Sequence, residues 1–435
     1  MKNTILHTSE MYLPAASVDQ EKWAVVACDQ YTSQPEYWET VTNTVGDAPS
    51  TLHLILPEMY LNQPDMDQRI QTIHQTMDQY LTDGTLQNVG DGLILVSRQS
   101  GGAIRHGVVC AVDLEAYDYN GSASPIRPTE KTVVERIPPR LAVRKGASLE
   151  LPHIMLLIDD PEKKIIEPLF DDVSQYQEVY NTDLLMWGGD LKGYFVPKGE
   201  KTQAIFDAFA ELGDPDHFHQ KYDLKKEYPT LFFAVGDGNH SMATAKAYWE
   251  EIKQTLSPEE AGNHPARFAL VEIINIHESS LIIEPIHRVL FNADPQALFA
   301  AAESYYTARG CTFERLDVPP VQEESVHYFP YFSTTGIGVI KIENPAWSLP
   351  LATLQSFLDD YLASHPETSI DYIHGSDTTV ELATKDNNIG FLLPDISKNG
   401  LFKGVICDGV LPRKTFSMGH AYEKRYYMEA RKIVK

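Results

Sequence analysis

The chain has 435 residues and carries a formal net charge of −25. Its length allows one large domain or two ordinary ones, and its hydrophobic and charged fractions of 43% and 22% are typical of soluble globular proteins. The excess of acidic residues argues against broad contact with nucleic acid or an anionic membrane, because both require a basic surface. A small anionic ligand remains compatible with it, since salt screens charges beyond roughly 8 Å and a local cluster of Arg and Lys can dominate its own surroundings.

Neither a membrane span nor a disulfide framework is predicted. The N-terminal residues MKNTILHTSEMYLP contain no long apolar run and no small-residue cleavage pattern, and no later segment reaches spanning length. We therefore expect a cytoplasmic protein. The cysteines Cys28, Cys110, Cys311 and Cys407 are scattered singly, so neither a disulfide framework nor a zinc site is indicated. Three of them lie in apolar strand-like runs, where we expect small buried side chains.

The first part of the chain predicts an α/β unit at residues 1–121. Short apolar runs predict strands at 23–28 (WAVVAC), 51–56 (TLHLIL), 93–97 and 107–114. Residues 66–81 place Ile70, Ile73, Met77 and Tyr80 on one face of a helix, and Gly84 follows the end of that helix.

The next segment, 127–145, is the most basic part of the chain. Its cations are Arg127, Lys131, Arg136, Arg140, Arg144 and Lys145, and its only acids are Glu130 and Glu135. Two interpretations stay open: a solvated helix face with ion pairs, or a clamp for phosphate or carboxylate, for which Arg geometry is well suited. In the second interpretation Arg140 and Arg144 bind the anion, and the surrounding cations keep Glu130 ionised as a general base.

Residues 231–252, LFFAVGDGNHSMATAKAYWEEI, predict a strand, a tight polar turn and a helix. Such a helix start aims unpaired N–H groups at an anion. We expect the phosphate to bind at Gly236, Gly238, Asn239 and Ser241. Asp237 could accept a hydroxyl proton or hold a metal ion, and His240 is either a catalytic acid or a hydrogen-bonded scaffold. The alternative is a turn with a purely conformational role, since Gly-Asp-Gly-Asn sequences are common in turns.

The remaining elements complete a core domain that we place at residues 122–435, with a sub-boundary near 291. Further strands are predicted at 153–158, 268–276, 281–283, 391–393 and 404–407, and helices at 202–212, 294–308, 351–362 and 417–433. His287 and Arg288 follow one apolar strand, and Arg413, Lys414 and Thr415 form a basic and hydroxyl cluster on a turn near the end. We expect both groups to contribute to phosphate or nucleotide binding. The predicted fold class is mixed α/β.

Four ordered motifs resemble the bacterial and archaeal family catalogued as domain of unknown function 1015. They are RPTEKTVVERIPPRLAVR, GDGNHSMATA, EPIHRVL and LPRKTF, and they cover most of the chain from Arg127 onward. The second is similar to the family's Asp-Gly-His-His-Arg signature, with Asn239 in place of the first histidine and Ser241 in place of the arginine. A cation is therefore missing at the turn, and Arg140, Arg144, Arg288 or Arg413 could supply it.

The same turn has a more distant likeness to ParB-like and sulfiredoxin-like proteins, some of which are kinases for free serine. That resemblance implies a phosphate cradle at Asp237 to Ser241, Glu130 as general base, and Arg413 and Lys414 as cations that neutralise transferred charge.

The first functional hypothesis is a small-molecule phosphotransferase that uses ATP or ADP with Mg²⁺ and acts on a small hydroxyl metabolite such as serine. Asp237 would be the metal ligand, and a phosphatase built on the same groups is a close variant. The second hypothesis is a non-catalytic regulatory protein that binds a nucleotide or metabolite at the same anion site. DNA binding is disfavoured by the net charge. The oligomeric state stays open.

Overall fold

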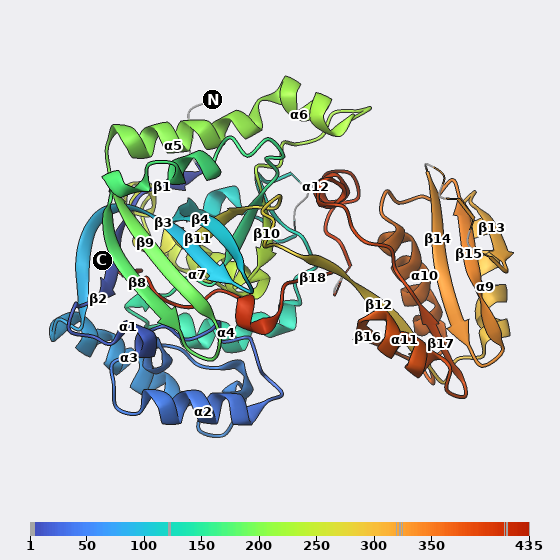
Figure 1. The fold of residues 1–435 in the computed structure, drawn as a ribbon, viewed down its shortest axis with the longest axis horizontal. Helices are drawn as coiled ribbons and strands as arrows, with labels where there is room; N and C mark the ends of the chain where they lie inside the picture. The colour runs from blue at the N-terminus through green and yellow to red at the C-terminus, as the bar shows by residue number, and fades with distance from the viewer. Residues whose placement is uncertain are drawn as a thin grey trace. The chain divides into compact units, whose positions relative to one another are not determined.

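The computed structural model describes residues 5–120, 123–318, 320–321, 323, 325–412, 414 and 416–434. It divides into two compact units, Met1–Leu281 with Gly419–Lys435 and Ile282–Met418 (Figure 1). The fold is mixed α/β, as the sequence predicts. The expected boundary near residue 121 falls inside the first unit, and the expected sub-boundary near 291 falls close to the start of the second.

One large sheet organises the first unit. Its described strands are β1 (Leu6–His7), β2 (Ser9–Pro14), β3 (Leu86–Ser100), β4 (Ala103–Asp113), β5 (Ile126–Pro128), β7 (Met155–Ile158), β8 (Gln177–Leu184), β9 (Gly189–Pro197), β10 (Phe233–Asp237) and β11 (Phe268–Asn275). The main path runs β5-β10-β7-β11-β4-β3-β9-β8, while β1 pairs with β4 and β2 with β3. Strands from both sides of residue 121 therefore share this sheet. A small second sheet joins β6 (Leu149–Glu150) to β19 (Arg431–Lys432).

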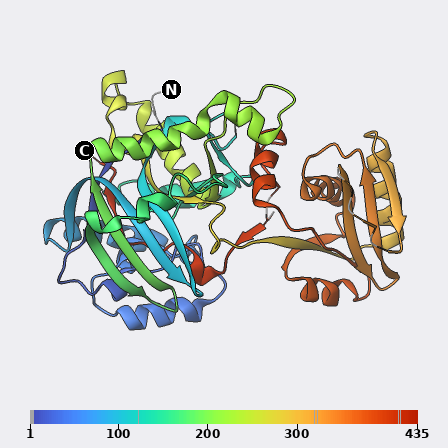
Figure 2. The ribbon, with the colours of Figure 1, turned by 45° about the horizontal axis from the view of Figure 1, so that its top comes forward.

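Helices cover both faces of the large sheet (Figures 1 and 2). The described α-helices of this unit are α1 (Gln20–Trp23), α2 (Pro35–Val45), α3 (Met66–Thr82), α4 (Ile137–Arg144), α5 (Glu200–Ala210), α6 (Pro215–Tyr222), α7 (Asn239–Lys253) and α8 (Pro258–Gly262). Alternate residues of β3 point to opposite faces. Ile94 packs in one core cluster with α2 and α3, whereas Leu93 packs in a second cluster with α5 and α7.

The strand, turn and helix predicted at 231–252 are confirmed as β10 and α7. The helix predicted at 66–81 is likewise confirmed as α3, which buries Ile70, Ile73, Met77 and Tyr80. Both segments carry strong local signals, a long apolar periodicity in α3 and an abrupt glycine-rich turn before α7.

Four predicted elements are wrong. Residues 51–54 form a 3₁₀ helix, and Ser50 caps it by accepting a hydrogen bond from the Leu52 N–H. Residues 23–28 follow the end of α1 with a single bridge at Val26 in place of a strand. Residues 404–407 lie in helix α12 (Lys398–Cys407), and 417–433 contain short extended segments instead of a terminal helix. Short apolar runs do not discriminate strand from helix, and long-range contacts decided these cases.

The second unit has its own sheet and core. The described strands are β12 (Ile283–Phe291), β13 (Thr312–Leu316), β14 (Val326–Ser333), β15 (Gly336–Glu343), β16 (Ser369–His374), β17 (Asn388–Phe391) and β18 (Phe416–Met418), in the order β13-β15-β14-β17-β12-β16, with β18 also on β12. Its described α-helices are α9 (Pro295–Thr307), α10 (Pro350–Ser364), α11 (Ser376–Ala383) and α12. Leu298 of α9 and Leu354 of α10 pack with β14 and β15 in one apolar cluster.

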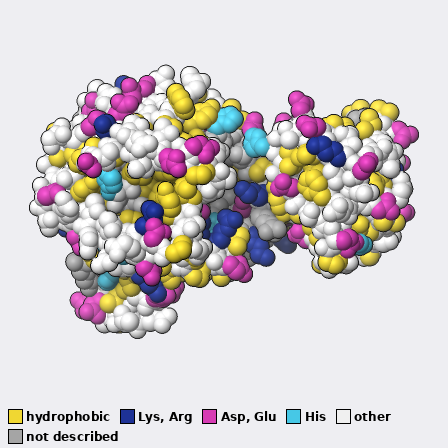
Figure 3. Space-filling model, turned by 90° about the horizontal axis from the view of Figure 1, so that it is seen from below, with side chains coloured by type: hydrophobic (Ala, Val, Ile, Leu, Met, Phe, Trp, Pro, Cys, Tyr) yellow, Lys and Arg dark blue, Asp and Glu magenta, His cyan; other side chains and the backbone are white. Residues whose placement is uncertain are grey.

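The molecular surface agrees with the acidic composition. Asp and Glu side chains are spread over both units on the face drawn in Figure 3, with smaller groups of Lys and Arg among them. Among the described residues, no helix has both the length and the apolar character needed to cross a bilayer.

Candidate functional site

The turn between β10 and α7 depends on Gly238. This residue has φ of 74°, a left-handed conformation that L side chains rarely adopt. A Cβ atom placed there would lie 2.9 Å from the Ile154 Cα, so the neighbouring backbone also leaves no room for a side chain. Gly236 precedes it at a register irregularity in the pairing of β10 with β7. The chain therefore turns sharply from the end of β10 into α7.

The first N–H groups of α7 have no side-chain cap. Gly238 is the N-cap and supplies no side-chain acceptor, so the N–H groups of Asn239, His240 and Ser241 receive no side-chain cap. The Asn239 Oδ1 atom is buried and has no hydrogen-bond partner within the described part of the chain. Uncapped N–H groups at the start of a 15-residue helix, with the helix dipole behind them, favour an anion.

Asp237 lies at the end of β10 with both carboxylate oxygens engaged. Its Oδ1 accepts the Gly238 N–H at 2.9 Å, and its Oδ2 lies 3.2 Å from the Lys424 Nζ. The Asp237 side chain is 19% exposed, so a ligand at the turn can reach it. Mg²⁺ in nucleotide sites is commonly held by one or two carboxylates together with phosphate oxygens, and Asp237 fits that role if Lys424 moves to a phosphate.

Glu130 is brought to the same edge of the sheet. β5 runs parallel to β10, and just after it Thr129 donates its N–H and its hydroxyl to the Val235 carbonyl, at 3.3 and 2.8 Å. Three residues beyond Glu130, the Val133 N–H donates to His240 Nε2 at 3.4 Å. Because both flanking residues are tied to β10 and α7, Glu130 lies beside the turn. Glu130 and Asp237, the two predicted catalytic carboxylates, thus lie at the carboxyl ends of neighbouring parallel strands.

His240 is held as a neutral imidazole. Burial, followed by the charges of Arg140 and Arg136, lowers the pKa of His240 to about 4. Since its Nε2 accepts the Val133 N–H, the ring proton is assigned to Nδ1. A neutral ring with one N–H is a hydrogen-bond donor at pH 7 and a poor general acid. The interpretation of His240 as a donor is therefore favoured over that of a catalytic acid.

Arg140 and Arg144 on α4 both form ion pairs with glutamates. Arg140 contacts Glu58, and the Arg144 Nη2 lies 2.5 Å from the Glu150 Oε2. All four side chains are at least four-fifths buried. The carboxylate partners of these arginines support the interpretation as ion pairs. The charge of Arg140, which acts on His240 at the turn, supports the interpretation as an anion clamp.

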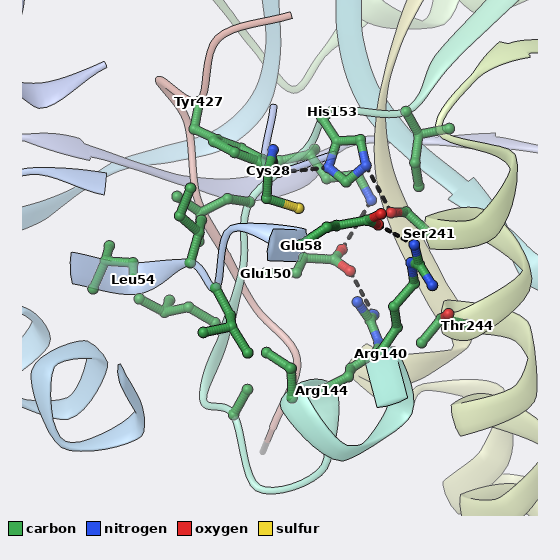
Figure 4. Close-up of a pocket in the computed structure, with 18 of the residues that line it drawn as sticks. Cys28, Leu54, Glu58, Arg140, Arg144, Glu150, His153, Ser241, Thr244 and Tyr427 are labelled. Atoms are coloured by element: carbon green, nitrogen blue, oxygen red, sulfur yellow. Dashed lines mark hydrogen bonds and ion pairs between the residues drawn. The ribbon is translucent and has the colours of Figure 1, made fainter. Parts of the chain in front are cut away.

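A cavity of about 150 Å³ lies next to the turn (Figure 4). Its walls are mainly aliphatic and include Leu54, Ile55, Leu56, Met77, Val143 and Leu149. Polar side chains enter it from α4 and α7, among them Arg140, Arg144, Ser241 and Thr244. Ser241 thus belongs to both features, as the third residue of α7 and as part of the cavity wall.

A chain of hydrogen bonds runs behind Ser241. The Ser241 Oγ lies 2.7 Å from His153 Nε2, and His153 Nδ1 lies 2.8 Å from the Tyr427 hydroxyl. The Cys28 N–H donates to the same hydroxyl at 3.1 Å. Burial raises the pKa of the Cys28 thiol, so this cysteine is a neutral thiol and not a nucleophile.

Four polar side chains lie near the turn although the sequence did not indicate them as site residues: Asp29, Glu58, His153 and Lys424. Burial alone would raise the pKa of Asp29, but the charge of His153, a hydrogen bond from Gln30 and the charge of Lys424 together hold it below its usual range. Asp29 directly follows an apolar run, and that position was its only signal. Glu58 and Lys424 had none, because their place here depends on long-range packing.

The other predicted binding residues belong to the second unit. Arg288 on β12 is fully buried, donating to the Gln355 Oε1 and the Ile286 carbonyl, both at 2.7 Å. His287 Nδ1 accepts the Leu393 N–H at 3.1 Å. The Lys414 carbonyl accepts from Arg288 at 3.0 Å, while Arg413 and Thr415 lie outside the described residues. The binding roles of these five residues stay predictions.

Comparison with known proteins establishes the family. The model of the family described as "Protein of unknown function (DUF1015)" matches residues 13–361, so the chain belongs to this family, as the resemblance implies. Three of the four motifs lie within the matched residues, and LPRKTF lies beyond them. No curated protein matches the chain.

Several solved structures are similar to this chain at low identity. Free serine kinase in complex with AMP has 10% identity and a TM-score of 0.38, covering 74% of this chain and 90% of its own. A conserved hypothetical protein from Pyrococcus furiosus has 10% identity and a TM-score of 0.36, covering 75% and 95%. SbnI with a C-terminal truncation, from Staphylococcus aureus, has 8% identity and a TM-score of 0.35, covering 72% and 82%.

Proposed function

We propose that this protein is a small-molecule phosphotransferase that moves a phosphoryl group between a nucleotide and the hydroxyl of a small metabolite. The observation that carries the proposal is the uncapped start of α7, with Glu130 and Asp237 beside it and Lys424 within reach. Phosphoryl transfer needs positioning and charge neutralisation more than covalent chemistry, and these groups supply both.

Each group has a role in the proposed reaction. Glu130 accepts the proton of the substrate hydroxyl while the hydroxyl oxygen attacks phosphorus. The bond between phosphorus and the leaving oxygen of the nucleotide then breaks. The N–H groups of Asn239 to Ser241 and the Nδ1–H of His240 donate to phosphate oxygens. Lys424 leaves the Asp237 carboxylate and forms an ion pair with the phosphoryl group that is transferred.

A divalent cation fits the donor set at the end of β10. Asp237 would hold Mg²⁺ together with phosphate oxygens, and Mg²⁺ would neutralise charge on the nucleotide. Among the described residues, no group of three or more His, Cys, Asp or Glu side chains could hold a metal by itself. The protein would therefore take up Mg²⁺ with the nucleotide.

Turnover followed by phosphorus-31 NMR, with ATP, Mg²⁺ and a panel of hydroxyl metabolites, tests this proposal. Glu130→Gln and Asp237→Asn are expected to lower the rate by about 100-fold or more, since a general base and a charged ligand each contribute on this scale. Asp47→Asn is the control, because Asp47 is an exposed acid on a loop. Full turnover in both site variants, with the fold retained, would disprove these roles.

A second candidate is a regulatory protein that binds a nucleotide without changing it. The ion pair between Asp237 and Lys424 favours it, because this contact satisfies the carboxylate that would otherwise bind Mg²⁺. Protein that binds ADP in a thermal-shift assay, loses this binding in Asp237→Ala and turns over no acceptor in the panel would support this candidate.

A further inference from the structure

The cavity beside α7 carries an inference about the ligand it takes. Cavities of about this volume, lined by Leu and Ile, can hold a benzene-sized guest, which means roughly six to eight non-hydrogen atoms. The aliphatic walls come from residues 54–56, from α3 and from the segment around α4 (Figure 4). Size and lining together favour a small ligand whose body is mainly apolar.

Four charged side chains in the wall already have ion-pair partners. Arg140 contacts Glu58, and Arg144 contacts Glu150. Glu150 also accepts from Arg431 at 2.8 Å and from the Leu270 N–H at 2.8 Å. A ligand ammonium would find both wall glutamates already paired with arginines, so it would have to break one of these buried pairs or remain uncompensated, and both are costly. The cavity therefore selects against ammonium ions and zwitterions.

The polar wall presents a hydroxyl donor at Ser241. The Ser241 Oγ lies 2.7 Å from His153 Nε2, and His153 Nδ1 lies 2.8 Å from the Tyr427 hydroxyl, so both ring nitrogens of His153 are engaged. A hydroxyl has one donor and two acceptor sites, so the contact with His153 leaves Ser241 able to bond an oxygen atom of a ligand. Thr244, in contrast, donates its hydroxyl to the His240 carbonyl at 2.7 Å.

A second donor in the wall is the Arg144 Nε, which is buried and has no partner among the described residues. The cavity therefore offers donors to an oxygen atom and apolar contacts to everything else. A small apolar molecule with one hydroxyl or carbonyl oxygen fits this arrangement. A free amino acid, which carries an ammonium and a carboxylate on its Cα atom, does not.

We propose that this cavity binds a small neutral alcohol with an apolar body, which is the acceptor substrate of the proposed phosphotransferase. The role of the ligand as acceptor substrate rests on the proposed function, whereas its chemical class rests on the cavity alone. Ser241 connects the two sites, because it holds the ligand oxygen and stands in the first turn of α7. Serine is then a poor substrate.

Binding of cyclohexanol to the full chain tests this inference, with L-serine as the zwitterionic comparison and saturation-transfer NMR titration as the measurement. Cyclohexanol is expected to bind, and serine is not. Ser241→Ala should weaken cyclohexanol binding about fivefold, the typical worth of one neutral hydrogen bond. Ala147→Leu should abolish it by filling the cavity, since Ala147 is a buried wall residue.

The matched control for the cavity-filling variant is Ala204→Leu, which adds the same atoms to an exposed position on α5. ADP binding, measured on the same samples, reports whether each variant is folded and whether the nucleotide site works. ADP binding without cyclohexanol binding overturns this inference and leaves the phosphotransferase proposal standing. Cyclohexanol binding that Ala147→Leu does not change, or serine binding that competes with it, also overturns it. Cyclohexanol binding without ADP binding supports the ligand class and overturns the proposed function.

Discussion

At the scale of single residues, the turn after β10 relies on a glycine that no other residue replaces without cost. Gly238→Ala forces a left-handed φ on alanine and places its Cβ against the Ile154 backbone. We expect a loss of roughly 2 to 4 kcal/mol in unfolding free energy, measured by urea denaturation. Gly84→Ala is the matched control, because Gly84 has φ of 82° and nothing within 4 Å of a Cβ there. It should lose only about 1 kcal/mol, and equal losses in the two variants would contradict the role of Ile154.

The neutral state of His240 predicts a pH dependence of stability. Its pKa is lowered to about 4 in the folded chain from an ordinary value near 6.5, so between these values the unfolded state binds more protons. The stabilisation is complete above pH 6.5 and is lost as the pH falls towards 4. After a discount for solvent screening, the loss is on the order of 1 to 2 kcal/mol.

Urea unfolding of the wild type and His240→Gln at pH 7 and pH 4.5 measures this contribution. Gln retains an acceptor for the Val133 N–H but does not titrate, so the wild type should lose more stability than the variant on acidification. Other buried histidines titrate equally in both proteins and cancel in the difference. Parallel losses would show that His240 is already protonated, or exposed, in the folded state.

At the scale of elements, the segment 419–431 returns from the second unit and is fixed to the first by buried charges. Arg425 is 3% exposed and contacts Glu272, Glu429 and the Pro152 carbonyl. Burial would raise the pKa of the Glu272 carboxyl, but the charges of Arg425 and Arg105 hold it below its usual range. This segment also carries Lys424, the partner of Asp237. The network therefore positions a residue of the candidate site.

Arg425→Met is expected to lower the unfolding free energy by about 3 to 5 kcal/mol, because it leaves buried carboxylates without their main partner. Arg69→Met is the control, since Arg69 forms an exposed ion pair with Asp65 that is worth about 1 kcal/mol or less. Both variants are compared by urea denaturation. A loss under 1 kcal/mol in Arg425→Met would indicate that water reaches the carboxylates and that the network does not fix the segment.

This segment also marks the limit of what the sequence predicts. Residues 417–433 have a composition compatible with a helix, but Tyr12 pairs with Ala430 and Val26 with Tyr426, and these distant partners make the chain extended. Conversely, the apolar run at 404–407 belongs to a helix whose start is set by Ser397, which accepts the Gly400 N–H. The cap at Ser397 is a local signal, but the apolar run at 404–407 outweighed it in the prediction. The extended segments at 417–433, in contrast, depend on distant strands and had no local signal.

The residues of the candidate site also differ in how far the sequence indicates them. The turn from Gly236 to Ser241 is visible in the sequence, because strand, glycines and helix are contiguous. The position of Glu130 beside it follows from the parallel pairing of β5 with β10, which no local pattern specifies. His153 and Lys424 reach the site through the folding of segments that are far apart in the sequence, so single-sequence reasoning had no means to select them.

At the scale of the whole molecule, the second unit begins and ends at paired residues. Ile283 of β12 lies opposite Met418 of β18 in an antiparallel pair, so the two ends of this unit are roughly 5 Å apart. A short linker can therefore join Leu281 to Gly419 in place of residues 282–418. Each unit also has hydrophobic clusters of its own. We predict that the first unit folds alone after this deletion.

The shortened chain separates the predicted binding residues into two sets. It keeps Glu130, the turn from Gly236 to Ser241, and Lys424, and it lacks His287, Arg288 and residues 413–415. We expect one cooperative unfolding transition by circular dichroism and ADP binding within about threefold of the full chain by calorimetry. Cooperative unfolding without ADP binding would assign part of the nucleotide site to residues of the second unit, as the basic clusters in the sequence suggest. Loss of the cooperative transition would show that the first unit needs the second for its stability.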